Sequence, residues 1–182
     1  MTARLLQFAD RVCAAVGWLC ARLVVVMVAA GALGAVLRYL APALGITPAL
    51  NALGDVQWML FSAVFLLGAG WVLAEDAHVR VDVLYGRLST RRRAWVDLLG
   101  SVFLLLPFCG LVLWASWPGV VEAVVLREGA LDAGGLPRWP VRLLVPLGVG
   151  LLAIQGVAQA VRAALTMPAS AASRTGPRRA EP

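Results

Sequence analysis

Four long apolar runs without a charged residue divide this chain, at residues 23–37, 56–74, 98–117 and 143–161. Each run comes close to the roughly 20 apolar residues with which an α-helix crosses about 30 Å of hydrocarbon. The 182-residue chain is 61% hydrophobic, which is more than a soluble core needs, so the excess must face lipid or other helices. The sequence therefore predicts an all-α membrane protein with four transmembrane helices, spanning about 18–40, 56–74, 95–117 and 141–162.

These four spans and their connectors use nearly the whole chain, so we expect a single transmembrane domain over residues 1–166. Residues 167–182 are rich in Ala, Ser, Pro and Arg and are expected to form a disordered cytoplasmic tail. The apolar run near the N-terminus is longer than a secretory signal requires, and we interpret it as an uncleaved first span.

The basic residues are all arginines, and twelve of the 16 lie on one side of the implied membrane. They occur in the N-terminal segment, between the second and third runs, and after the fourth run. The other four are Arg38, Arg127, Arg138 and Arg142. Because arginine-rich connectors stay in the cytoplasm, we expect both termini and the 75–95 connector to be cytoplasmic. The net charge of +6 could suggest nucleic acid, but its placement favours membrane lipids as the partner.

The seven tryptophans all fall near a predicted membrane boundary, which is where the amphipathic indole is favoured. The predicted lipid-interface residues are Trp18, Trp71 and Trp95 at the inner boundary, Trp58, Trp114 and Trp117 at the outer boundary, and the cluster Arg91, Arg92 and Arg93.

The connectors carry the local signals for turns and bends. Pro42 and Pro48 predict an outer loop over residues 42–54, after which Asp55 can cap the second helix. The apolar spacing of residues 81–88 predicts a short interfacial helix in the cytoplasmic connector. Pro107 and Pro146 are each expected to bend the helix that contains them.

The polar residues offer little chemistry. Gln155 in the fourth run is expected to face other helices and hydrogen-bond to them, with a substrate contact as the alternative. The cysteines (Cys13, Cys20 and Cys109) match no disulfide or metal pattern and are interpreted as small apolar helix residues. His78 lies among Glu75, Asp76 and Asp82, which could suggest a metal, but a docking role is the stronger interpretation. We predict no catalytic, metal-binding or cofactor-binding residues.

Two sequence blocks carry a resemblance to a known family. The first is His78-Val79-Arg80-Val81-Asp82-Val83-Leu84, followed by Leu88-Ser89 and the arginine cluster. The second comprises the residues at 134–140 (GGLPRWP), 145–148 (VPLG) and 151–156 (LLAIQG). With the four-helix layout, these blocks make residues 15–165 resemble the small membrane subunit, DctQ type, of a tripartite ATP-independent periplasmic (TRAP) transporter.

The resemblance implies a multi-pass protein of a bacterial inner membrane that is a scaffold for a large permease subunit, which carries the sodium and solute sites. A periplasmic solute-binding protein delivers an organic acid such as a dicarboxylate, and an ion gradient drives symport without ATP. The outer connector 122–139 becomes a candidate contact for the binding protein. Residues 78–82 become a candidate contact for the large subunit or an ordering element of the inner connector. The candidate partner-interface residues are His78, Arg80, Asp82, Glu122, Pro137, Trp139 and Gln155.

Two other functions compete with this interpretation. An autonomous four-helix multidrug-type transporter needs a carboxylate buried within a span, and the four runs contain none. A membrane subunit of an oxidoreductase needs paired outer cysteines or haem-ligating histidines, and the chain has one histidine.

Overall fold

The computed structural model describes residues 2–44, 47–75, 88–130 and 135–172, and every regular element in this part of the chain is helical. The elements are α1 (Thr2–Leu44), α2 (Thr47–Ala74), α4 (Thr90–Leu99), a π-helical turn η1 (Gly100–Leu105), α5 (Leu106–Val125) and α6 (Trp139–Ala172). Four helical stretches are long and apolar enough to cross a membrane: Leu6–Leu40, Asn51–Ala74, Arg91–Val125 and Trp139–Leu165. The predicted all-α fold with four spans is confirmed.

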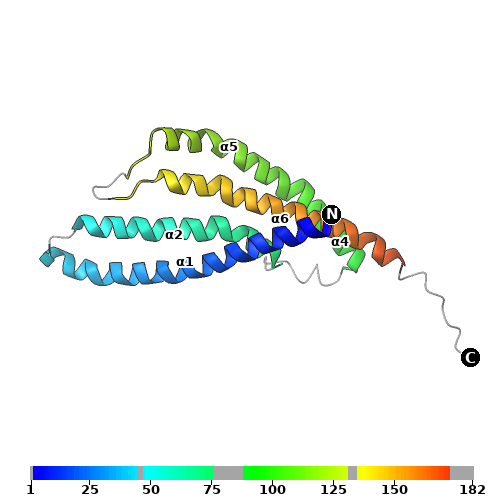
Figure 1. The fold of residues 1–182 in the computed structure, drawn as a ribbon, viewed down its shortest axis with the longest axis horizontal. Coiled ribbons are helices and arrows are strands. Elements are labelled where there is room, and N and C mark those ends of the chain that lie inside the picture. The colour runs from blue at the N-terminus through cyan, green and yellow to red at the C-terminus, as the bar shows by residue number, and fades with distance from the viewer. Residues whose placement is uncertain (1, 45–46, 76–87, 131–134, 173–182) are drawn as a thin grey trace, which may run out of the picture.

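The helices lie side by side in an open layer, in the order α1, α2, α6 and α5 (Figure 1). Helix α6 is central, since it packs against α2 on one side and against α4, η1 and α5 on the other. Near its N-terminal end α1 also reaches α6. The start of α1 and the end of α6 therefore lie at the same end of the layer, which we call the terminal end; the opposite end is the connector end.

Small residues let the helices approach closely, as is typical of helix packing in membranes. On α1 the buried face contains Ala9, Cys13, Gly17 and Cys20 at helical spacing, so the two cysteines serve as small packing residues as expected. The open layer leaves many large apolar side chains uncovered, including Val25 of α1 (68% exposed) and Trp114 of α5 (77% exposed). In a membrane these faces meet lipid or other protein helices.

The third span contains the irregularity expected near Pro107. The π-helical turn of η1 comes immediately before Pro107, which occupies the first turn of α5. Proline lacks a backbone N–H and its ring collides with the carbonyl four residues earlier, so widening the preceding turn accommodates it. Helix α6, in contrast, runs through Pro146 as one helix.

Several helix ends differ from the sequence-based expectation. Helix α1 continues to Leu44 and α2 begins at Thr47, so most of the loop expected over 42–54 is helical. Pro48 is compatible with this because the first turn of a helix does not use its N–H groups. Asp55 therefore lies inside α2 and does not cap it.

Helices α5 and α6 also extend further than the sequence analysis expected. Helix α5 continues past Trp117 to Val125, with Pro118 inside it, and α6 extends to Ala172, into the segment expected as a tail. Residues 81–87 of the expected interfacial helix and residues 173–182 of the tail lie outside the described residues.

Candidate functional site

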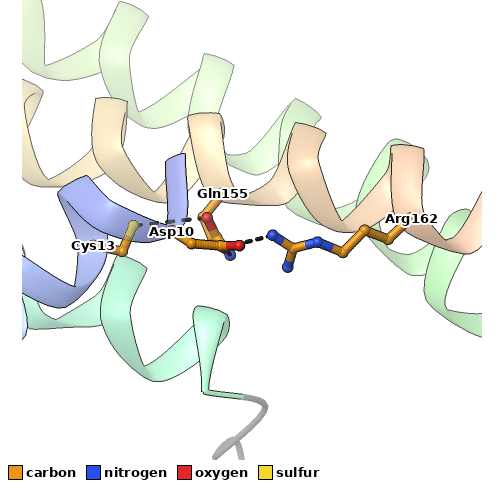
Figure 2. Close-up of polar contacts among 4 residues, drawn as sticks. All are labelled: Asp10, Cys13, Gln155 and Arg162. Atoms are coloured by element: carbon orange, nitrogen blue, oxygen red, sulfur yellow. Dashed lines mark hydrogen bonds and ion pairs between the residues drawn. The ribbon is translucent and has the colours of Figure 1, made fainter. Parts of the chain in front are cut away.

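Polar side chains gather in two places, one at each end of the layer. At the terminal end, Asp10 and Cys13 of α1 face Gln155 and Arg162 of α6, and we call these four residues the α1–α6 cluster (Figure 2). The Gln155 amide donates to Asp10 Oδ1 at 3.4 Å and its oxygen accepts the Cys13 thiol at 3.7 Å. Arg162 Nη2 donates to the same Asp10 oxygen at 2.5 Å.

Helical spacing explains how this cluster forms. Asp10 and Cys13 are three residues apart on α1, and Gln155 and Arg162 are seven apart on α6, so each pair shares one helix face. Gln155 is the largest fully buried side chain described, with 1% of its surface exposed. The hydrogen bonding to another helix expected for Gln155 is confirmed. Its contact with a partner subunit stays a prediction.

Asp10 and Arg162 are the members of this cluster that the sequence analysis missed. Asp10 is the only acidic residue before Asp55, which was the available signal. Its carboxylate receives hydrogen bonds from both Arg162 and Gln155, so the cluster ties two helices together. Among the described residues no group of three or more His, Cys, Asp or Glu side chains could hold a metal ion.

At the connector end, Glu128 organises the chain between α5 and α6. Its backbone carbonyl accepts the N–H groups of Arg138 at 2.9 Å and Trp139 at 3.4 Å. Its carboxylate accepts two hydrogen bonds from Arg142, at 3.1 and 3.2 Å. This two-pronged guanidinium–carboxylate geometry fixes direction as well as distance. Arg127, just before it, has a φ of 47°, the left-handed conformation that turns the chain after α5.

A second set of contacts joins this connector to α2. Asp55 Oδ2 accepts the backbone N–H of Leu136 at 2.9 Å, and the Arg138 guanidinium lies 5.8 Å from the centre of the Trp58 ring. Asp55 thus holds the α5–α6 connector against the neighbouring helix instead of capping its own.

The predicted partner-interface residues of this end lie near Glu128. Glu122 is exposed and lines an open hollow of about 360 Å³ together with Glu128 and Arg142. Pro137 is exposed and Trp139 begins α6 half-buried. The other predicted interface residues, His78, Arg80 and Asp82, lie outside the described residues.

The predicted lipid-interface tryptophans are solvent- or lipid-accessible, from 38% for Trp71 to 77% for Trp114. Two of them have specific neighbours: Trp18 lies 3.2 Å beneath the Arg22 guanidinium, and Trp71 packs over Gly17. Arg91 and Arg92 are exposed, whereas Arg93 Nε donates to the Leu88 carbonyl at 3.1 Å.

Comparison with protein families matches residues 27–166 to the family described as tripartite ATP-independent periplasmic transporters, DctQ component. The chain belongs to the DctQ family. This family of transporter components indicates the small membrane subunit of a TRAP transporter, a multi-pass membrane protein, and the resemblance found in the sequence is confirmed. The matched segment contains Gln155, Arg162 and the whole α5–α6 connector, while Asp10 and Cys13 precede it. Comparisons with curated proteins and with solved structures find no match.

Proposed function

We propose that this DctQ subunit is the stationary scaffold of an ion-gradient-driven importer of an organic acid. In this role it enlarges and anchors the large permease subunit, which holds the sodium ions and the solute. The family membership is the observation that carries the proposal. The open helix layer supports it, because a scaffold needs a broad apolar surface for a membrane partner.

The mutual engagement of the polar groups between α1 and α6 also supports a scaffold. Asp10 is paired with Arg162, and Gln155 is bonded to α1. A transported ion or acid needs charged or polar ligands that can exchange partners, whereas these side chains hold helices together. Solute recognition accordingly belongs to the other subunits.

We further propose that both termini lie in the cytoplasm of a bacterium and the α5–α6 connector in the periplasm. The arginine distribution supports this orientation, and the shared terminal end of α1 and α6 is compatible with it. A green fluorescent protein fused after Pro182 should fluoresce, and one inserted after Gly129 should remain dark. The reverse pattern would contradict the orientation.

The α5–α6 connector and the 75–95 connector then lie on opposite sides of the membrane and have different proposed partners. Glu122, Pro137 and Trp139 lie at the connector end and form the proposed contact with the solute-binding protein. His78, Arg80 and Asp82 form the proposed contact with the large subunit on the cytoplasmic side.

Reconstitution into sodium-gradient liposomes tests the scaffold role. The chain alone should give no uptake of any organic acid, and uptake should require the large subunit and the binding protein together. Uptake by this chain alone would overturn the proposal. For the connector end, Glu122→Lys should raise the concentration of binding protein that gives half-maximal uptake. Glu75→Lys, a charge reversal at the other end of the layer, is the matched control and should leave that concentration unchanged.

A further inference from the structure

The hollow between α1 and α2 near the connector end belongs to none of the contacts described so far. It has a volume of about 200 Å³ and opens at the surface of the layer. Its wall consists of small and apolar residues with two polar side chains, and the lining residues that matter are Gly31, Gly34, Arg38, Leu53, Gly54 and Gln57. The connector contacts of Asp55 lie elsewhere, since Asp55 does not line the hollow.

The two polar side chains that line this hollow, Arg38 and Gln57, both carry hydrogen-bond donors. Within the described part of the chain, Arg38 forms no ion pair and Gln57 forms no side-chain hydrogen bond. The Gln57 amide lies across Gly31, where a Cβ would come within 2.8 Å of its nitrogen. A guanidinium offers five N–H donors and an amide two, so the lining of the hollow is rich in donors and contains no acidic side chain.

We infer that this hollow binds a phospholipid, with the phosphodiester at Arg38 and the ester group and first part of one acyl chain inward of it, along Gly34, Gly54 and Gln57. A cation at the edge of two apolar spans complements the charge of a phosphate, and an arginine recognises phosphate through several parallel hydrogen bonds. The neighbouring Trp58 is 48% exposed, as expected of an indole at headgroup level. The apolar wall supplies the surface for the chain of such a lipid.

Two variants separate the headgroup contact from the acyl-chain contact. Arg38→Gln removes the charge at the mouth. Gly54→Leu places a bulky side chain at the wall of the hollow, at a position where no atom lies within 4 Å of an added Cβ. The matched controls are Arg92→Gln, which removes an exposed arginine at the terminal end, and Gly110→Leu, which adds the same side chain to an open helical glycine of α5.

The experiment titrates the full delipidated chain in detergent with phosphatidylglycerol, and separately with diacylglycerol of identical acyl chains, and counts bound lipids by native mass spectrometry. Arg38→Gln should weaken phosphatidylglycerol binding roughly tenfold, the effect of losing one charge-assisted hydrogen-bonded contact. It should leave the weaker diacylglycerol binding unchanged. Gly54→Leu should weaken the binding of both lipids, and the two controls should match the wild type.

The other outcomes overturn the inference. A decrease in only one of the two variants would mean that headgroup and chain do not share this hollow. Equal binding by all variants would place the bound lipids elsewhere. If both variants bind lipid normally but lose co-purification with the large subunit, the hollow is a protein contact. That result would leave the proposed scaffold role intact, which depends on the reconstitution experiment instead.

Discussion

Helix α6 meets its neighbours along two seams that are built differently. On the α2 side, backbone lies against backbone: a Cβ added at Gly148 would collide with the Leu66 carbonyl group, and one at Gly70 would touch the Leu151 carbonyl at 3.4 Å. On the α5 side, side chains mediate the contact. The nearest atoms to a Cβ added at Gly156 belong to leucine side chains, Leu105 at 2.7 Å and Leu106 at 3.6 Å.

This difference indicates which part of the subunit is rigid. A backbone carbonyl can move only if its helix moves, whereas a leucine side chain can adopt another rotamer. The α1–α6 cluster adds side-chain hydrogen bonds on the same side of α6 as the α2 seam. We therefore expect helices α1, α2 and α6 to form the fixed part of the layer. We expect the third span, with its π-helical turn, to be the part that adjusts to a partner.

The largest expected effect comes from filling the backbone seam. Gly148→Ala should destabilise the subunit by about 1–3 kcal/mol, because α2 and α6 must separate to admit the new methyl group. The midpoint of thermal unfolding in detergent should fall accordingly. Gly150→Ala is the control: no atom lies near a Cβ there, and alanine favours helix over glycine, so the midpoint should stay or rise. Equal decreases for both variants would contradict a close backbone seam.

Breaking the α1–α6 cluster should lower the stability of the subunit somewhat less than Gly148→Ala does. Gln155→Leu removes the contacts with Asp10 and Cys13 and should cost roughly 1 kcal/mol, which is typical of hydrogen bonds between membrane helices. The change should also weaken co-purification with the large subunit, since α1 would be tied to α6 by the Asp10–Arg162 pair alone. Gln159→Leu, one turn further along and without a hydrogen bond to the described residues, is the matched control. Unchanged assembly with an altered solute preference would instead indicate that Gln155 contacts the solute.

Filling the α5 seam should be tolerated better. Gly156→Ala is expected to cost less than about 1 kcal/mol, because a rotation of the Leu105 side chain makes room and alanine improves helix propensity. The informative quantity is the difference between the unfolding midpoints of Gly148→Ala and Gly156→Ala. If Gly156→Ala is as harmful as Gly148→Ala, the third span is held as rigidly as α2.

The features that could be predicted from the sequence were those with a local pattern. The four spans followed from long apolar runs, the irregularity near Pro107 from proline stereochemistry, and the inward orientation of Gln155 from the high cost of exposing an amide to lipid. Each of these needs only a short stretch of sequence.

The features that were missed depend on distant residues. Asp10 and Arg162 are 152 positions apart, so no spacing rule relates them. Asp55 was expected to cap α2, but the helix begins earlier at Thr47, and the partner of Asp55 is the Leu136 backbone 81 positions away. Pro42 and Pro48 suggested a longer loop because the tolerance of helix ends for proline depends on the exact register. The arrangement of the helices in one layer, in the order α1, α2, α6 and α5, likewise has no local signal in the sequence.

The smallest effect on stability is expected from the two ion pairs of α6, Arg142–Glu128 and Arg162–Asp10. Both are partly exposed: Arg142 and Glu128 at 50% and 34%, and Arg162 and Asp10 at 36% and 48%. Double-mutant cycles with Gln and Asn replacements should therefore give coupling energies of about 1 kcal/mol or less for each pair.

Asp10–Arg162 should have the larger coupling, because Asp10 is also held by the Gln155 amide and has less freedom to leave its arginine. Added salt should reduce the Glu128–Arg142 coupling more, since that pair has no such support. A stronger and salt-resistant Glu128–Arg142 coupling would mean that α5 is fixed to α6 through its connector, and the third span could not then be the adjustable part of the scaffold.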